Sequence, residues 1–399
     1  MWHFDVHDLR IARPAQFHRP HAACVLLHAR QSSRSSERVN FVIFGLTISS
    51  AWANGHATPW RALLKGLRHE GHTATFFEQD VAYYAAHRDL AAPEFCDLVL
   101  YSDWPSALPV ARTALASADV AIVTSYCPDG LAACQLVLDT PGPLHVFYDM
   151  DTPMTIAALE RDGVAVADGV HYLTPDLIPA FDLYLSFSGG PQLDCLRARW
   201  GARRTAPLYG SVDPEVHTPV AQPPDEFRCA MGYLGTYAAD RQPALDRLFL
   251  QPARQTPNQR FLVVGSLYPD NLRWPANVRT LAHLEPPMHP AFYSANRITL
   301  SVSRQAMLDW GYTPSGRLFE ATSCGTPLLS DPFPGIEAFF VPGDEILVAE
   351  STRDALAALE LSDAELAQIA AAGRERTLAE HTGTARARQL AAACEAVRC

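Results

Sequence analysis

The segment GYTPSGRLFEATSCGTPLLSD, residues 311–331, sets Arg317 and Glu320 one helical turn apart between two apolar runs. Glycines and prolines lie on both sides of the pair, and Ser315 is a favoured residue type at a helix N-cap. The pattern predicts a strand, a short loop and a helix that begins near Ser315. In open α/β sheets, ligands bind at such loops, at the carboxyl ends of the strands. The segment therefore predicts an α/β fold and one part of a ligand site.

Short apolar runs separated by helix-length segments extend in both directions from this segment, which is typical of buried parallel strands. The helix expected after the first run, PWRALLKGLRHEGH (59–72), has its apolar residues at helical spacing. The sequence therefore predicts two doubly wound domains. The expected strands of the first are NFVIFGL (40–46), TATFFE (73–78), ADVAIVTSY (118–126), LHVFYDM (144–150) and FDLYLSF (181–187), and those of the second are CAMGYLGTY (229–237), RFLVVGS (260–266), RITLSVS (297–303), TPLLSD (326–331) and EILVAES (345–351).

Five prolines between residues 206 and 226 disfavour both helix and central strand, so we expect the interdomain linker there. An S-x-x-E pattern at Ser362 predicts a helix start. The last helix is expected to carry Ala and Leu on one side and Arg386 and Arg388 on another. The predicted division is a poorly ordered extension (1–38), a first Rossmann-like domain (39–205), the linker (206–226), a second Rossmann-like domain (227–373) and a C-terminal helix (374–399).

The chain has an acidic charge balance. Its 399 residues include 32 Lys and Arg against 43 Asp and Glu, which gives a net charge of −11. At long range this charge repels nucleic acid and anionic membrane surfaces, so neither is expected as a partner. A small anionic ligand needs only a few arginines gathered locally.

Nine cysteines are widely spread and contain no C-x-x-C pair, which predicts neither a disulfide framework nor a zinc site. The histidines of residues 1–38 also lack metal-ligand spacing. No apolar run approaches the ~18 residues that a membrane span needs. We therefore expect a soluble protein of the cytoplasm without a bound metal.

In the second domain, glycines, hydroxyls and arginines follow the apolar runs. A helix start suits a diphosphate because it presents unpaired N–H groups and a partial positive charge, and guanidinium groups add strong hydrogen bonds. Glu320 instead suits two vicinal ribose hydroxyls. The alternative is an ion pair with Arg317 on a solvated helix face, worth only ~0.2–0.5 kcal/mol. The candidate nucleotide-binding residues are Gly235, Thr236, Arg241, Gly265, Arg304, Ser315, Gly316, Arg317 and Glu320.

These motifs resemble a known group. SGRLFEATSCGTPLLSD (315–331) resembles the signature near the nucleotide site of GT-B glycosyltransferases. Together with GLTISSAWANGHATPWRALLKGLRHEGH (45–72), YDMDTP (148–153), LSFSGGP (185–191) and GYLGTYAADRQPAL (232–245), it resembles the CgeB-like group, named after a spore maturation protein, over roughly residues 40–385.

The resemblance implies two Rossmann-like domains that face each other across a cleft. The second would bind a nucleoside diphosphate sugar, the first would bind the acceptor, and the last helix would cross back to the first domain. Glu320 would bind the ribose, and Arg241 and Arg317 would contact the diphosphate. Many retaining members carry a Glu where this chain has Tyr312, so the stereochemical outcome stays open.

The first domain is expected to supply the acceptor side. His56 follows the first strand and suits a general base or a hydrogen-bond donor, with a helix-cap role for its loop as the alternative. The D-x-D pattern after LHVFY suits an acceptor or base role; metal binding is the other reading, which we do not favour because GT-B enzymes generally work without a metal. SFSGGP (186–191) suits a backbone nest or a glycine turn. The candidate catalytic residues are His56, Asp149 and Asp151, and the candidate acceptor-side residues are Asn54, Gly55, Ser188 and Gly189.

The sequence therefore predicts a glycosyltransferase of the hexosyltransferase type, with no cofactor and an acceptor that the sequence does not identify. Arginines and a helix start would stabilise the departing diphosphate. A sugar-nucleotide epimerase of the same fold and a non-catalytic nucleotide-sugar sensor are the alternatives. A Rossmann dehydrogenase is disfavoured because no G-x-G-x-x-G follows the first strand.

Overall fold

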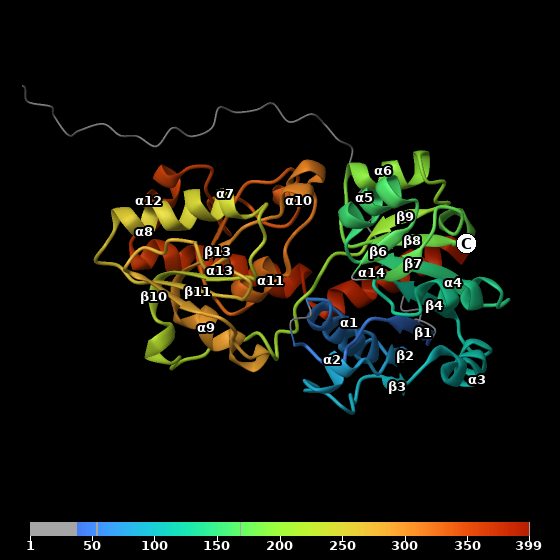
Figure 1. Ribbon diagram of the computed structural model, residues 1–399. Helices are drawn as coiled ribbons and strands as arrows, with labels where there is room; N and C mark the ends of the chain where they lie inside the picture. Colours follow the sequence, from blue (N-terminus) through green and yellow to red (C-terminus); the bar gives the residue numbers. More distant parts are fainter. Residues whose placement is uncertain (1–37, 53–54, 168, 399) are drawn as a thin grey trace, which may run out of the picture. The chain divides into compact units, whose positions relative to one another are not determined.

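The computed structural model describes residues 38–52, 55–167 and 169–398. Nearly all of the predicted N-terminal extension, and the candidate residue Asn54, lie outside the described residues. The chain from Arg38 onward forms one compact unit. It contains two lobes, each built on its own parallel sheet (Figure 1).

The first lobe contains a seven-stranded sheet in the order β3-β2-β1-β4-β5-β8-β9, with every neighbouring pair parallel. The five strands predicted for this lobe are confirmed, while β3 and β9 at the sheet edges were not predicted. A separate antiparallel hairpin joins β6 (Ala165–Ala167) to β7 (Val170–Leu173). The sheet strands are β1 Asn40–Gly45, β2 Thr73–Gln79, β3 Asp97–Tyr101, β4 Val120–Thr124, β5 Leu144–Asp149, β8 Leu183–Ser186 and β9 Thr205–Pro207.

Helices connect these strands as expected for a doubly wound sheet. The helix predicted after the first strand is confirmed as α1 (Ala57–His69), and its apolar stripe, which includes Trp60 and Leu67, is buried. The other helices of this part are α2 Ala82–Ala85, α3 Trp104–Leu115, α4 Gly130–Leu138, α5 Thr152–Asp162 and α6 Pro191–Ala198, with a 3₁₀ turn, η1, at Ile178–Ala180.

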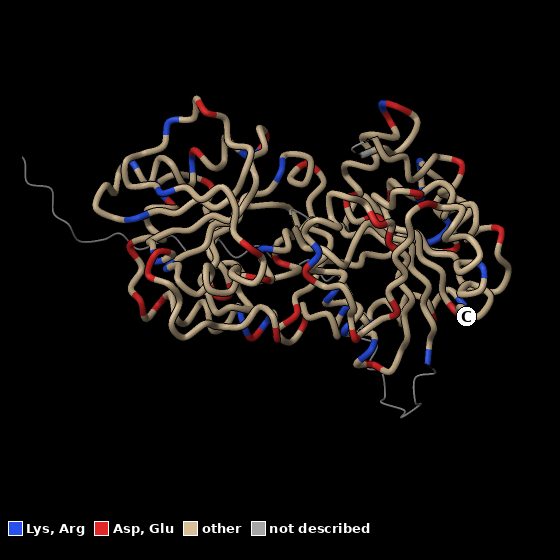
Figure 2. The backbone as a smooth tube through the Cα atoms, turned by 60° about the horizontal axis from the view of Figure 1, so that its bottom comes forward, with Lys and Arg blue, Asp and Glu red and all other residues tan. Residues whose placement is uncertain are grey.

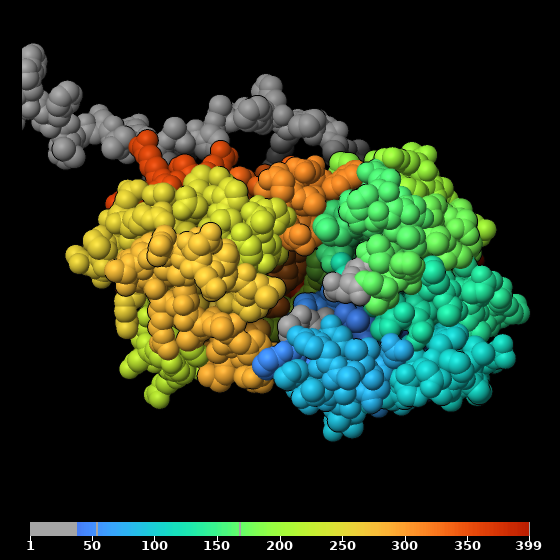
Figure 3. Space-filling model, viewed as in Figure 1, coloured from blue at the N-terminus to red at the C-terminus, as the bar shows by residue number. Residues whose placement is uncertain are grey.

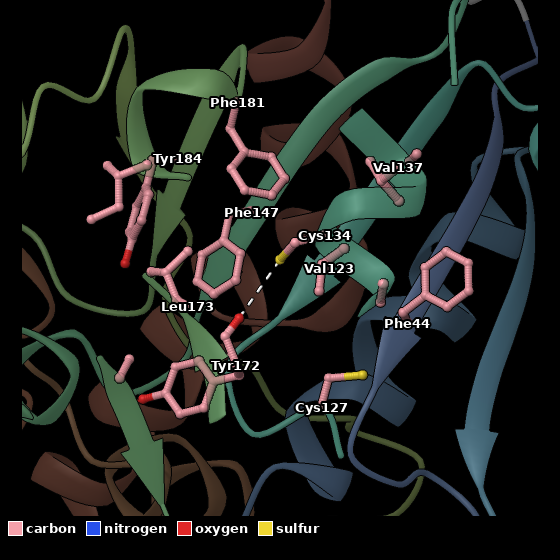
Figure 4. Close-up of a cluster of buried hydrophobic side chains, with 14 of the residues drawn as sticks. Phe44, Val123, Cys127, Cys134, Val137, Phe147, Tyr172, Leu173, Phe181 and Tyr184 are labelled. Atoms are coloured by element: carbon pink, nitrogen blue, oxygen red, sulfur yellow. Dashed lines mark hydrogen bonds between the residues drawn. The ribbon is translucent and has the colours of Figure 1, made fainter. Parts of the chain in front are cut away.

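Both faces of the first sheet are packed with apolar side chains. One cluster, which contains Phe44, Phe147, Phe181 and Tyr184, is drawn in Figure 4. In that cluster the Cys134 thiol lies 3.6 Å from the carbonyl oxygen of Tyr172, and a dashed line in Figure 4 marks this hydrogen bond. Burying each such side chain contributes roughly 1.5–3 kcal/mol to the free energy of folding, so this cluster is a main source of the lobe's stability.

The second lobe contains a six-stranded parallel sheet in the order β12-β11-β10-β13-β14-β15. Its five predicted strands are confirmed, and the edge strand β12 was not predicted. The strands are β10 Cys229–Leu234, β11 Phe261–Val264, β12 Val278–Leu281, β13 Asn296–Ser301, β14 Leu328–Ser330 and β15 Leu347–Val348. The helices are α7 Gln242–Leu245, a π-helical turn η3 Asp246–Leu250, α8 Gln251–Gln255, α9 His289–Ala295, α10 Gln305–Trp310, α11 Gly316–Ser323 and α12 Thr352–Glu360, with short 3₁₀ turns η2 Asp225–Phe227, η4 Pro286–Met288 and η5 Ile336–Ala338.

Two long helices end the chain. The capping box predicted at Ser362 is present and opens α13 (Asp363–Glu380). The last helix, α14, runs from Gly383 to Arg398, inside the predicted C-terminal segment (374–399), and α13 occupies the first residues of that segment. Figure 1 shows α14, in red, beside α1 of the first lobe, and Ala387, Leu390 and Cys394 of α14 belong to that lobe's core.

Close glycine contacts allow α14 to pack on α1. A Cβ atom added at Gly66 would lie 2.3 Å from the carbonyl oxygen of Gly383, and one added at Gly383 would lie 1.9 Å from that of Ala62. Both distances are shorter than real carbon contacts allow, so the two backbones touch. The crossing segments also pair: Val212 of the Pro-rich linker donates its N–H to the His381 carbonyl at 3.0 Å, and Gly383 donates back to Val212 at 3.0 Å.

Candidate active site

Two adjoining cavities lie where the carboxyl ends of both sheets meet. The larger, of about 530 Å³, is lined by loops that follow strands of both lobes and by the start of α11. The smaller, of about 240 Å³, is lined mainly by the loops after β10, β11 and β12 of the second lobe. Gly55 lines both. Figure 3 shows one face of the molecule, with side chains of the first lobe in blue to green and those of the second lobe in yellow to orange.

Arginines give the larger cavity an excess of positive charge. Arg241 and Arg304 line it, and Arg304 also donates to Asp240 at 3.2 Å. Arg241 donates only weakly, at 3.4 Å to the carbonyl of Thr236, and its Nε is buried with no acceptor among the described residues. Burial lowers the pKa of Arg241, and the nearby guanidinium groups of Arg317 and Arg304 lower it further. An anion bound here would relieve this repulsion.

The start of α11 lies at the same cavity. The Ser315 hydroxyl caps the helix by accepting from the N–H of Arg317 at 3.4 Å, as the sequence predicted. Ser315 and Gly316 both line the cavity, which brings the first turn of this helix next to the arginines. The partial positive charge of a helix start adds to theirs.

Arg317 itself lines neither cavity. Its Nε donates to the carbonyl of Leu234 at 2.6 Å and its Nη1 to the hydroxyl of Ser301 at 3.3 Å. The guanidinium carbon lies 5.2 Å from the centre of the Tyr233 ring. Arg317 therefore stabilises the backbone at the end of β10. It contributes its positive charge to the electrostatic potential at the cavities, although its side chain does not line them.

Glu320 lines the smaller cavity together with Gly235, Thr236 and Gly265. Its Oε2 accepts a hydrogen bond from the hydroxyl of Tyr293 at 2.9 Å. Burial raises the pKa of Tyr293 well above its ordinary value, so the phenol stays protonated and keeps donating. No ion pair joins Arg317 to Glu320 within the described part of the chain. Although the two residues are one turn apart, their side chains bind different partners.

In the first lobe, His56 and Asp151 line the larger cavity. The Nε2 atom of His56 lies 3.7 Å from Oδ2 of Asp151, and the same carboxylate oxygen accepts from the Tyr126 hydroxyl at 3.0 Å. The rings of His56 and Tyr126 meet edge to face at 4.9 Å. His56 is the N-cap residue of α1, but its side chain makes no capping hydrogen bond. The geometry therefore fits a histidine oriented by a carboxylate.

Tyr126 was not singled out from the sequence. It follows β4, and its φ of 65° is a left-handed backbone conformation that is uncommon for a tyrosine. Such strained residues cluster at functional sites. The only sequence signal for it was its position at the end of an apolar run.

Asp149 lies outside the cavity, contrary to the expectation that it would act there. Its carboxylate is fully buried and accepts from the Tyr184 hydroxyl at 2.7 Å, the Thr155 hydroxyl at 2.9 Å and the N–H of Asp151 at 3.1 Å. Burial raises its pKa to about 6, against the lowering effect of these hydrogen bonds. Because Asp149 is the last residue of β5, its side chain faces the lobe interior, whereas Asp151 lies beyond the strand end.

Ser188 and Gly189 are also buried away from the cavity, contrary to the expected acceptor role. The Gly189 N–H donates to the carbonyl of Tyr312 in the second lobe at 2.9 Å, so the proposed nest is occupied by the chain itself. A Cβ atom at Gly190 would lie 2.3 Å from the Tyr312 ring, and one at Gly335 would lie 2.5 Å from it. The glycines therefore hold the Tyr312 ring where the two lobes meet.

Two buried carboxylates that the sequence analysis did not name hold the loops around the cavities. Glu78, at the end of β2, accepts from the N–H groups of Ile48 at 2.8 Å and Ser49 at 3.0 Å, in the loop that leads to the first-lobe cavity wall. Asp331, after β14, accepts from the N–H and the hydroxyl of Ser303, each at 3.0 Å. Burial raises the pKa of Asp331 despite these bonds. Both acids end an apolar run, which is the signal that could have found them.

Charges elsewhere are mixed. Figure 2 shows acidic and basic residues interspersed along both lobes. Among the residues that the structure describes, no group of three or more His, Cys, Asp and Glu side chains is arranged to hold a metal ion. Within the same residues, no helix has the length and apolar character needed to cross a membrane.

The comparisons with known proteins agree with this geometry. Residues 241–392 match the model of a family described as glycosyl transferase-like. No curated protein sequence matches the chain. Among solved structures, sucrose-phosphate synthase from Thermosynechococcus elongatus superposes with a TM-score of 0.62 at 15% identity, over 90% of this chain and 99% of that one. The chain has the GT-B fold.

Other structures with the GT-B fold are equally similar. HepE from Anabaena, in complex with UDP-glucose, gives a TM-score of 0.64 at 12% identity over 90% of this chain and all of its own. The catalytic domain of starch synthase IV from Arabidopsis thaliana, bound to ADP and acarbose, gives 0.64 at 10% identity over 90% and 99%. At such low identities the likeness shows the shared fold, and function has to be argued from the site.

Proposed function

We propose that this protein is a glycosyltransferase that moves a hexosyl group from a nucleoside diphosphate sugar to a hydroxyl of an acceptor. The observation that carries the proposal is the pair of adjoining cavities, with unneutralised positive charge at Arg241 in one and the carboxylate of Glu320 in the other. The likeness of residues 241–392 to the glycosyl transferase-like family supports it. Membership of the CgeB-like group and a cytoplasmic location stay predictions.

The nucleotide would bind mainly to the second lobe. Arg241, Arg304 and the first turn of α11 (Gly316–Ser323) would hold the diphosphate, and Glu320 would accept hydrogen bonds from the ribose hydroxyls. Hydrogen bonds to charged groups are worth about 1.5–3 kcal/mol each, so these contacts together suffice for specific binding. In this proposal the arginines neutralise the leaving group and no metal takes part.

The similar structures suggest which donor to test first. HepE and an alpha-glucosyltransferase were solved with UDP-glucose, and starch synthase IV with ADP. For this chain we propose UDP-glucose as the first donor to test and ADP-glucose as the second.

His56 would be the general base, with Asp151 holding its ring. The acceptor hydroxyl would lose its proton to His56, and its oxygen would form a bond to the anomeric carbon of the donor sugar. The bond from that carbon to the diphosphate would break, and the diphosphate would leave with the electron pair towards the arginines. His56 and Asp151 belong to the first lobe and the arginines to the second, so both lobes are needed for turnover.

The experiment is to measure binding of UDP and UDP-glucose by calorimetry to the parent protein and to Arg241→Ala. Loss of one charge-assisted contact should weaken binding about 10-fold or more. The matched control is Arg254→Ala, because Arg254 is an exposed arginine of the same lobe that pairs with Asp246 at 3.1 Å. If Arg241→Ala bound both ligands as tightly as the control, the assignment of the diphosphate site would be wrong.

A further inference from the structure

The first-lobe wall of the larger cavity is apolar and aromatic. It is formed by Leu46 after β1, Tyr84 of α2, Tyr126 after β4, Met150 after β5 and Phe187 after β8. These residues come from five separate segments of the first lobe, yet all five contribute apolar surface. Across the cavity, the second lobe adds apolar surface through Val302 and Met307, and it also contributes the hydroxyl groups of Ser303, Thr313 and Ser315 beside the two arginines.

The ionisable groups on this wall are few. Apart from the two tyrosines, the described first-lobe residues that line it include only His56 and Asp151 with titratable side chains. Asp151 already accepts from Tyr126 and lies beside His56. Lysine, arginine, asparagine and glutamine are absent from these described lining residues.

This composition discriminates between classes of acceptor. A sugar acceptor would lose the water molecules bound to its many hydroxyl groups. Leu46, Met150 and Phe187 offer few side-chain hydrogen-bond partners in exchange, and each unsatisfied buried hydroxyl costs roughly 1–3 kcal/mol. A phosphorylated acceptor would have to compete with the diphosphate for Arg241 and Arg304. An aromatic ring, in contrast, gains favourable contacts with the aromatic side chains and with the thioether sulfurs of methionine.

The volume also fits a small molecule. A cavity of about 530 Å³ lies within the range of sites that enclose drug-sized ligands, and here it must hold the transferred sugar as well as the acceptor. An acceptor with one or two aromatic rings fits this space.

We propose that the acceptor is a small uncharged aromatic alcohol, such as a phenol, which binds against the apolar first-lobe wall with its hydroxyl at His56. This inference rests on the proposed glycosyltransferase function and adds the substrate class. In the transfer step, the aryl hydroxyl gives its proton to His56 and its oxygen becomes bonded to the anomeric carbon. The carbon–diphosphate bond breaks, and the nucleoside diphosphate is released.

The test uses the full chain with UDP-glucose or ADP-glucose and three acceptors: 4-methoxyphenol, methyl glucoside and fructose 6-phosphate. Donor binding is measured first by calorimetry. Transfer to each acceptor is quantified by chromatography, and all products are identified by mass spectrometry. We expect the aryl glucoside as the main product. Transfer to either sugar acceptor in preference to the phenol would overturn the inference and leave the proposed function standing, whereas failure to bind either donor would overturn both.

A pair of variants tests the wall itself. Phe187→Ala removes a half-buried ring and should lower kcat/KM for 4-methoxyphenol about 10-fold, with donor affinity unchanged. Phe187→Leu, which keeps apolar volume, should recover part of the loss. The matched control is Val110→Ala, because Val110 is 49% exposed on α3 of the same lobe and should have no effect. Equal kcat/KM for Phe187→Ala and the control would contradict an acceptor site on this wall.

Discussion

The carboxylate of Glu320 is held in one position by a neighbouring side chain. The buried phenol of Tyr293 donates to its Oε2 at 2.9 Å and fixes the carboxylate at the edge of the smaller cavity. A carboxylate held in this way is suited to accept from two neighbouring hydroxyls, as a ribose provides. It is poorly suited to a phosphate, which it would repel, so the residue distinguishes the sugar end of a nucleotide from its charged end.

This role predicts selectivity against deoxyribose. The parent protein should bind UDP more tightly than 2′-deoxy-UDP, because the deoxy ligand leaves one carboxylate hydrogen bond unmade. In Glu320→Ala, UDP affinity should fall about 10-fold or more and the preference for the ribose ligand should disappear. Competition calorimetry with the two nucleotides checks both points. A preference that survives in the variant would assign the ribose to other groups.

The contact between α1 and α14 shows how two helices are matched to each other. Both helices have unremarkable sequences on their own, but Gly66 and Gly383 allow their backbones to touch. The apolar side chains of α14 can then enter the core that Trp60 and Leu63 of α1 begin. The helix pair is therefore specified by the absence of side chains at two positions as much as by the apolar residues around them.

A methyl group at this contact should push the helices apart. Gly66→Ala is expected to lower the free energy of unfolding by ~1–3 kcal/mol, because the added carbon would overlap the Gly383 backbone, which cannot move aside as a side chain can. Urea denaturation measures the effect. His69→Ala, on the exposed side of the same helix, is the control and should change stability by less than ~0.5 kcal/mol. Equal stability of the two variants would show that α14 adjusts at no cost.

Over the whole molecule, buried polar contacts hold the segment that leads from the second lobe to α14. His381, just before α14, has its Nε2 3.0 Å from the carbonyl of Phe339 in the second lobe, and its Nδ1 2.9 Å from a guanidinium nitrogen of Arg386. Since a guanidinium only donates, Nδ1 accepts and the imidazole is neutral with its proton on Nε2. Burial, followed by the charge of Arg386, lowers the pKa of His381 to about 3.

This neutral histidine predicts a loss of stability in mild acid. Below pH ~6.5 the unfolded chain binds a proton at His381 while the folded protein does not, so stability falls as the pH decreases towards 3. Between pH 7 and pH 5 the loss from this group should be about 2 kcal/mol. Urea denaturation at the two pH values should show a correspondingly smaller loss in His381→Gln than in the parent.

The comparison with the variant matters because Asp149, whose pKa is raised to about 6, acts with the opposite sign in the same pH range. As the pH falls, Asp149 takes up its proton in the folded protein at a higher pH than in the unfolded chain. Its contribution to the stability of the protein therefore increases. Both proteins contain Asp149, and its contribution cancels in the difference. Identical losses in parent and variant would mean that His381 is not the group responsible.

Local patterns predicted most of the fold and part of the site. The central strands were visible because they are continuous apolar runs, whereas β12 was hidden because it is an edge strand whose Arg279 and Thr280 are exposed. Arg386 was expected on a different helix side from the Ala and Leu residues, and the sequence did not show that it is only 2% exposed, with carbonyls of Tyr209 and Gly210 from the linker accepting from its guanidinium. Helical periodicity contains no information about such a distant partner.

The same limit applies to the site. Residues next to strand ends, such as Arg241 and His56, could be named because the topology brings all those ends together. Gly189 could not be excluded from the sequence, since its N–H is occupied by Tyr312, which lies far away along the chain. Likewise, the inward orientation of Asp149 depends on where β5 ends, and a shift of one residue would have reversed it.

The contribution of α14 to the first lobe has a consequence for biosynthesis. A ribosome makes the strands and helices of that lobe early, but Ala387, Leu390 and Cys394, which belong to its core, emerge only after the whole second lobe. Until then the nascent protein has an uncovered apolar helix face, the kind of surface that chaperones bind and that promotes aggregation. The lobe that is synthesised first is therefore completed last.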